Sequence, residues 1–120
     1  MYEIAIEDTF DAAHCLRDYE GSCSNLHGHT YRVRAAFRFR SLADSGLAFD
    51  FKKAKDLLKS ILDHLDHKYI NELSEFSIQN PSAENIARHI FDRIKDQVEQ
   101  VYSVSVWETP TSCATYFEED

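Results

Sequence analysis

The 120-residue sequence has little of several features that would indicate other classes of protein. Its three cysteines are an odd number without paired spacing, which argues against a disulfide framework and for a reducing compartment. No apolar run approaches membrane-spanning length, and no basic segment followed by an apolar run begins the chain, so we expect a cytoplasmic protein away from membranes. Lys and Arg number 13 against 21 Asp and Glu, and the resulting charge of −8 disfavours a nucleic acid as partner.

The chain also lacks internal repeats, low-complexity tracts and linkers, so residues 1–120 are expected to form one domain. What it has instead is alternation. Residues 2–14 carry apolar side chains at most even positions, and residues 29–40 carry them at odd positions. The even positions of the second segment hold mainly arginines: Arg32, Arg34, Arg38 and Arg40. A period of two predicts strands, and the loop 15–26 would join them as antiparallel neighbours.

Three histidines meet in this predicted hairpin. His27 and His29 are two residues apart and therefore share a face, and His14 ends the apolar face of the first strand. Three neutral imidazoles suit zinc and leave a fourth position for water or substrate, as in catalytic sites. The alternative is that each histidine is an ordinary polar residue at the edge of a sheet. Cys23 is either a reactive thiol beside the metal or a fourth ligand that closes a structural site.

The remaining segments predict two helices and two short strands. Asp50 is a candidate N-cap, followed by apolar residues at intervals of three and four up to Leu65, and Ser82 with Glu84 in the first turn begins a second helix. Strands are expected over residues 102–108 and 111–117. The order is strand, strand, helix, helix, strand, strand. This order predicts the α+β class, with a four-stranded antiparallel sheet and both helices on its apolar face.

Two further placements follow from parity and helical position. Tyr102, Val104 and Val106 share parity with Glu108, so this carboxylate either extends the buried face or lies on the solvent rim at the strand end. His64 and His89 are expected on the surfaces of the helices, and Cys15 and Cys113 have no identifiable catalytic position.

Several dispersed motifs occur in an order that one family shares. They are Phe10-Asp11-Ala12-Ala13-His14, Cys23 to His29, Phe49-Asp50-Phe51, Leu65-Asp66-His67, Asn80-Pro81-Ser82-Ala83-Glu84-Asn85 and Trp107-Glu108-Thr109-Pro110. Over essentially its full length the chain resembles the 6-pyruvoyl tetrahydropterin synthase and 6-carboxy-5,6,7,8-tetrahydropterin synthase family. The resemblance implies the tunnelling fold (T-fold), in which trimers close a twelve-stranded barrel and two trimers stack into a homohexamer. The arginine face would line the barrel, paired with Glu3 and Glu7.

The resemblance also implies roles for individual residues. His14, His27 and His29 would be the zinc ligands, and Cys23 would be the proton acceptor. Asp66 and His67 would be a proton relay, with a plain helix terminus as the alternative. Glu108 would anchor the pterin, because a carboxylate accepts two parallel hydrogen bonds from an amino group and the neighbouring ring N–H. Glu84 would cap its own helix, with a supporting role near the pterin as the weaker interpretation.

The spacing before the histidine pair points to a branch within the family. Three residues separate Cys23 from His27, which resembles the 6-carboxytetrahydropterin synthases of the queuosine (7-deazapurine) precursor pathway. The implied reaction is that of a zinc-dependent carbon–oxygen lyase: 7,8-dihydroneopterin triphosphate yields 6-carboxy-5,6,7,8-tetrahydropterin, acetaldehyde and triphosphate. The alternatives are pyruvoyl-type triphosphate elimination and a non-catalytic, zinc-stabilised pterin-binding protein. Lys52, Lys53 or arginines of a neighbouring subunit are candidates to bind the triphosphate.

Overall fold

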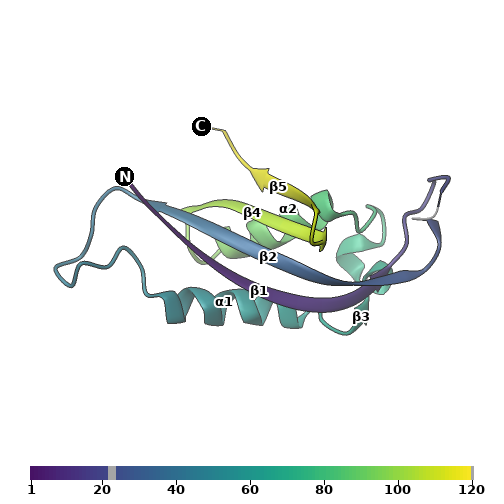
Figure 1. Ribbon diagram of the computed structural model, residues 1–120, viewed down its shortest axis with the longest axis horizontal. Helices are drawn as coiled ribbons and strands as arrows, with labels where there is room; N and C mark the ends of the chain where they lie inside the picture. Colours follow the sequence, from purple (N-terminus) through teal and green to yellow (C-terminus); the bar gives the residue numbers. More distant parts are fainter. Residues whose placement is uncertain (22–23, 120) are drawn as a thin grey trace.

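The computed structural model describes residues 1–21 and 24–119 and has the α+β architecture that the sequence predicts. Its elements are β1 (Tyr2–His14), β2 (His27–Phe39), α1 (Phe51–Asp63), β3 (Lys68–Tyr69), the 3₁₀ turns η2 (Ile70–Glu72) and η3 (Ser74–Phe76), α2 (Ala83–Lys95), β4 (Val101–Thr109) and β5 (Ser112–Phe117). The strands form one sheet in the order β3-β1-β2-β4-β5 (Figure 1). No helix in the described ranges is long and apolar enough to span a membrane.

The sheet differs from the prediction in one strand. The prediction of four antiparallel strands is correct for β1, β2, β4 and β5, but the two-residue β3 adds a fifth strand that pairs in parallel with Ala12 and Ala13. So short a strand has no detectable period of its own, which is why alternation in the sequence did not predict it. Its position beside the end of β1 matters because Asp66 and His67 immediately precede it.

The β1–β2 hairpin runs along the long axis of the molecule (Figure 1). Its register runs without interruption from Tyr2 opposite Phe39 to His14 opposite His27. The loop between the two strands lies at one end of the molecule, and the loop between β2 and α1 lies at the opposite end (Figure 1). The register therefore brings His14 and the His27–His29 pair together at one end, as the sequence predicts.

Both helices cover the apolar face of the sheet, with α1 packed against β1 and α2 against β4 and β5. The Asp50 carboxylate accepts the Lys52 N–H (2.9 Å) and the Ser82 hydroxyl accepts the Asn85 N–H (3.2 Å), which confirms both predicted N-caps. Such caps typically contribute about 1 kcal/mol each. The buried stripes of the helices comprise Ala54, Leu58, Ile61, Leu62, Ala83, Ile86, Ala87, Ile90, Phe91 and Ile94. This packing fixes the sheet on which the histidines stand.

The opposite face carries the arginines, and the predicted pairing with Glu3 and Glu7 is confirmed for Arg32, Arg34 and Arg38 but not for Arg40. Glu3 lies 2.9 Å from Arg38 and 3.7 Å from Arg34, and Glu7 lies 3.8 Å from Arg32. These side chains are all a third to a half exposed, so each pair contributes little stability by itself.

Two irregularities in β4 correct the parity argument. Ala36 and Phe37 of β2 pair with Ser103 and Val101, so Tyr102 is an extra residue. Its ring lies under the Arg38 guanidinium (3.5 Å), on the arginine face, and the prediction that Tyr102 shares the buried face is wrong. A bulge adds one residue to a strand and so changes which side chains point to each face. Counting odd and even positions along a sequence cannot detect this change.

Candidate functional site

Three imidazoles converge where the β1–β2 hairpin ends. His14 Nε2 lies 3.0 Å from His27 Nε2, and the ring centroids of His27 and His29 are 4.8 Å apart. One ring nitrogen from each of the three residues lies within 4.8 Å of the others. His14 is fully buried, whereas His27 and His29 are partly exposed, so the cluster opens to one side. The expected convergence of the three side chains is therefore present.

The hydrogen bonds of two of these rings fix which nitrogen is unprotonated. His14 Nδ1 lies 2.7 Å from the Pro81 carbonyl, and His27 Nδ1 lies 2.6 Å from the Asn25 carbonyl. A carbonyl only accepts, so both Nδ1 atoms donate and both Nε2 atoms carry lone pairs in the neutral rings. Two lone pairs facing each other at 3.0 Å repel unless a proton or a cation lies between them. Donation of the second ring nitrogen to a carbonyl is also the usual arrangement of metal-binding histidines.

The third ring supports the same fit. His29 Nε2 is buried without a hydrogen-bond partner in the described part of the chain, as is the Tyr31 hydroxyl beneath the histidines. Burial lowers the pKa of both His14 and His29, with Glu108 opposing that shift, so the neutral form that binds metals is favoured. The donor set fits a cation that accepts three nitrogen ligands, which is typical of zinc.

Glu108 is the second irregularity of β4 and faces the histidines. Trp107 pairs with Cys113 and Thr109 pairs with Ser112, so Glu108 is again an extra residue, and bulges commonly re-aim a side chain beside a site. Its carboxylate lies 4.0 Å from His14 Nε2 and is 29% exposed. The buried-face interpretation is therefore favoured over the solvent rim, and the carboxylate adjoins the imidazoles.

Glu108 borders two cavities. One, of about 600 Å³, is a notch between β2 and the β4–β5 turn that also contains His29, Arg32 and Trp107. The other, of about 250 Å³, lies at the start of α2 and contains Glu84. Glu84 is exposed in the first turn of α2, so the structure brings it near Glu108 without direct contact to the imidazoles.

Asp66 and His67 form a turn between α1 and β3. The two side chains lie 2.9 Å apart, and the Asp66 carboxylate accepts the Asp11 backbone N–H (2.9 Å). That backbone hydrogen bond and the neighbouring His67 imidazole lower the pKa of Asp66. His67 adopts a left-handed backbone (φ +58°) and donates its own N–H to the Asp11 carbonyl (2.6 Å). Its side chain is 76% exposed and borders a groove of about 600 Å³ that also contains His29.

Both interpretations of Asp66 and His67 stay open. The helix α1 ends at Asp63, but the Asp66 N–H still donates to the Leu62 carbonyl (2.8 Å), and a left-handed residue such as His67 is common just after a helix. His67 also borders the groove that contains His29, so the proton relay stays a prediction.

Two asparagines that the sequence reasoning missed hold the chain next to His14. Asn71 accepts the Cys15 N–H (3.0 Å) and donates to the Cys15 carbonyl (2.9 Å). Asn80 accepts the Arg17 N–H (2.8 Å) and donates to the Arg17 carbonyl (2.9 Å). Each side-chain amide thus pairs with a backbone as a neighbouring strand would. Asn80 was named only as part of a family motif, and nothing in the sequence pointed to Asn71.

Cys23 is one of the residues outside the described ranges, so its predicted place beside the histidines stays a prediction. Lys52 and Lys53 lie in the first turn of α1, and Phe51 next to them packs near Ala5 and Ile6 of β1, well away from the hairpin's histidine end. Within the described chain they do not border the cavities that contain His29 or Glu108.

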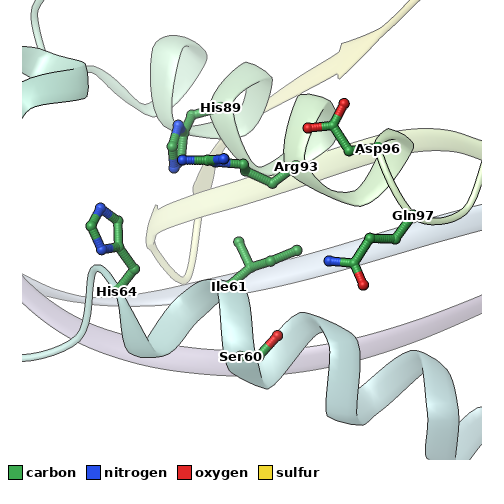
Figure 2. Close-up of a pocket in the computed structure, with 7 residues that line it drawn as sticks. All are labelled: Ser60, Ile61, His64, His89, Arg93, Asp96 and Gln97. Carbon is green, nitrogen blue, oxygen red and sulfur yellow. The ribbon is translucent and has the colours of Figure 1, made fainter.

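A separate cavity of about 270 Å³ lies on the helix layer, between α1 and α2 (Figure 2). His64 from the end of α1 and His89 from α2 face the same space, and Glu75 accepts from His64 (2.7 Å) while lying 3.7 Å from Arg93. His89 packs edge-on against Phe76 and is partly buried, so its prediction as a surface residue is wrong, whereas His64 is exposed as expected. This cavity contains none of the residues predicted for the active site.

Comparison with known proteins agrees with the geometry. The family model described as 6-pyruvoyl tetrahydropterin synthase matches residues 3–119. The chain belongs to this family. It is 36% identical to the 6-carboxy-5,6,7,8-tetrahydropterin synthase of Haemophilus influenzae over 98% of this chain and 100% of that protein, and 38% identical to the Synechocystis protein of the same name over 98% and 94%. The structure of Caenorhabditis elegans 6-pyruvoyl tetrahydropterin synthase matches with a TM-score of 0.87 at 28% identity, covering 99% and 98% of the two chains. The T-fold of the monomer is thereby confirmed.

Proposed function

We propose that this protein is a zinc-dependent carbon–oxygen lyase that converts 7,8-dihydroneopterin triphosphate to 6-carboxy-5,6,7,8-tetrahydropterin, with release of acetaldehyde and triphosphate, in the queuosine precursor pathway. The observation that carries the proposal is the convergence of three imidazoles, with lone pairs facing one another, beside the carboxylate of Glu108. The full-length similarity to two bacterial proteins named for this activity supports the choice of branch.

His14, His27 and His29 would hold the zinc. The Pro81 and Asn25 carbonyls orient the first two rings, which keeps their Nε2 atoms directed at one point. When bound, zinc supplies Lewis-acid polarisation of the substrate's side-chain hydroxyls and of the adjacent C–H bond. The protein's own contribution is to fix the ligands before substrate arrives.

Cys23, Asp66 and His67 would move protons. In this proposal the Cys23 thiolate takes a proton from the substrate side chain. His67 exchanges protons through the groove that it shares with His29, and the lowered pKa of Asp66 keeps a carboxylate beside the imidazole to stabilise its charged form. Support comes from the His67–Asp66 distance and from the exposure of His67 toward that groove.

Glu108 would bind the pterin. Its partly exposed carboxylate borders two cavities and can accept the amino group and the ring N–H of the pyrimidine edge side by side. Glu84, at the edge of the smaller cavity, has a supporting position.

The proposed assembly is a hexamer of two stacked trimers. Each copy contributes four long strands, so three copies supply the twelve strands of a closed barrel. The arginine face, which no helix of the described residues covers, would face the barrel interior. Closure would also remove the two open edges of the sheet.

The deciding experiment is turnover of 7,8-dihydroneopterin triphosphate by the zinc-loaded protein, with mass analysis of the pterin product and detection of acetaldehyde. Formation of the carboxy product with acetaldehyde supports the proposal. A pyruvoyl product without acetaldehyde identifies the pyruvoyl-type synthase, the name carried by the C. elegans structure. Absence of any product at full zinc occupancy would leave a pterin-binding protein without turnover.

The Cys23→Ala variant tests the thiol. We expect loss of turnover with about one zinc per chain retained, because three imidazoles suffice to hold the metal and the thiol acts on the substrate. Metal analysis and the turnover assay are run on the same sample. If the variant instead loses its zinc, Cys23 is a fourth ligand and the site is a closed, structural one.

A further inference from the structure

A substrate with a triphosphate group needs a cation, and the chain's net charge of −8 makes a local one necessary. Two basic residues of the described chain border cavities that also contain His29: Arg32 in the notch and Lys68 in the groove beside His67. Lys52 and Lys53, expected from the sequence, border neither. The choice therefore lies between Arg32 and Lys68.

Arg32 lies against an aromatic ring. Its guanidinium carbon lies 4.0 Å from the centre of the Trp107 ring, within cation–π range of the indole face. A guanidinium keeps its N–H donors at its edges, where they match two phosphate oxygens at once. Trp107 itself directly precedes Glu108, so the aromatic partner belongs to the same bulged end of β4 that presents the carboxylate.

The other charges on this face leave Arg32 available. Arg34 and Arg38 share Glu3, at 3.7 Å and 2.9 Å, whereas Arg32 has its close carboxylate, Glu7, at 3.8 Å. That distance is beyond hydrogen-bonding range, and both side chains are nearly half exposed. A phosphate arriving in the notch would displace a weak contact.

The notch itself joins the two faces of the sheet. The β2–β4 pairing ends at Arg32 opposite Trp107, and beyond it β2 continues to His27 paired with β1 but no longer with β4. In that gap Arg32 from the arginine face and His29 from the histidine face border one cavity of about 600 Å³ with Glu108. Lys68, by contrast, is a flexible cation in an open groove that lacks the pterin-binding carboxylate.

We propose that Arg32, beside Trp107, binds the phosphate chain of the substrate in the notch between β2 and the β4–β5 turn. This inference rests on the proposed function and names the chain's own residue for the anionic end of the substrate. In this arrangement Glu108 binds the pterin ring and Arg32 binds the phosphates. The imidazoles lie at the side-chain hydroxyls between them.

The test compares Arg32→Gln with Arg34→Gln, which removes the same charge one pleat further along β2, and with Lys68→Gln. We expect Arg32→Gln to raise KM for the triphosphate substrate roughly 10- to 100-fold, the factor that a charged hydrogen bond gives, while both comparison variants stay within about threefold of wild type. Arg32→Lys keeps the charge but loses the planar group, and its KM should lie between wild type and Arg32→Gln.

Inorganic triphosphate serves as a second probe, by calorimetry on the zinc-loaded proteins. Weaker binding of inorganic triphosphate by Arg32→Gln alone supports the inference, even if the wild type shows no turnover and the proposed function fails. A wild type that turns over, with Arg32→Gln unchanged in KM and in triphosphate binding, overturns the inference and leaves the proposed function intact. A larger effect in Lys68→Gln or Arg34→Gln overturns it as well.

Discussion

At the scale of single residues, the proposed metal site depends on hydrogen bonds that the histidines make through their other ring nitrogens. His14 is buried and donates to the Pro81 carbonyl, a contact between segments 67 positions apart in the sequence. A sequence pattern predicted that His14, His27 and His29 share a face. It did not predict the carbonyls that select their tautomers, because those partners come from loops whose paths follow no period.

The first prediction concerns His14→Ala. Removing one of three nitrogen ligands should reduce zinc from about one per chain to well below that level, since two imidazoles seldom hold zinc in competition with a chelator. Zinc is measured after dialysis against a mild chelator, with circular dichroism to check folding. The matched control is His64→Ala, which removes an exposed imidazole that pairs with Glu75. Full zinc in a folded His14→Ala protein would contradict the assignment.

A second prediction uses the cavity between the helices. Burial lowers the pKa of His89. The negative charges of Glu75 and Asp92 partly oppose this shift, and the positive charges of Arg93 and His64 add to it. The unfolded chain therefore binds a proton at His89 before the folded chain does. Stability from this residue is present above its ordinary pKa, about 6.5, and is lost as the pH falls below that value.

The variant that tests this effect is His89→Phe, whose ring can keep the edge contact with Phe76. We expect the free energy of unfolding of the wild type to fall more steeply than that of the variant between about pH 7.5 and 5.5. Urea titrations at each pH give the difference. The other histidines titrate in both proteins and cancel, so parallel pH profiles would show that His89 is not responsible.

At the scale of elements, regular segments followed from the sequence and irregular ones did not. The long β1 and β2 strands, α1, α2 and their caps agree with the period and capping residues. The bulges at Tyr102 and Glu108 and the two-residue β3 depend on pairing with other strands, which local patterns do not report. Two of these three irregularities adjoin the candidate site, where departures from regular structure are expected.

Asn80 gives the prediction at this scale, because its amide replaces a strand partner for Arg17. Asn80→Ala leaves the Arg17 N–H and carbonyl without these bonds, which should lower the free energy of unfolding by about 1–3 kcal/mol. Zinc affinity should also fall, since Pro81 next to it holds His14. Gln79→Ala, which removes an exposed amide, should change stability by less than about 0.5 kcal/mol. Equal stability of the two variants would exclude a role for the Asn80 amide in holding the strand exit.

At the scale of the whole molecule, the described part of a single chain leaves the two edges of the sheet without a neighbouring strand. β3 covers only Ala12 and Ala13 of β1, and β5 pairs on one side with β4 within the described chain. Tyr2 on the first edge and Phe117 on the second are large apolar residues, each 48% exposed. Natural sheets seldom leave such edges uncovered, so pairing between copies is expected.

The last prediction tests that pairing. Phe117→Glu places a charge at the β5 edge. In the proposed hexamer, closure of the barrel would bury this charge against the β1 edge of a neighbouring copy, so the mass in light scattering should be that of smaller species than the wild type. Ile78→Glu is the control, because Ile78 is an apolar residue 97% exposed between η3 and α2, away from both edges. Turnover should fall with the assembly in Phe117→Glu if a neighbouring copy completes the site. A Phe117→Glu hexamer of unchanged mass would mean that the copies associate through some other surface.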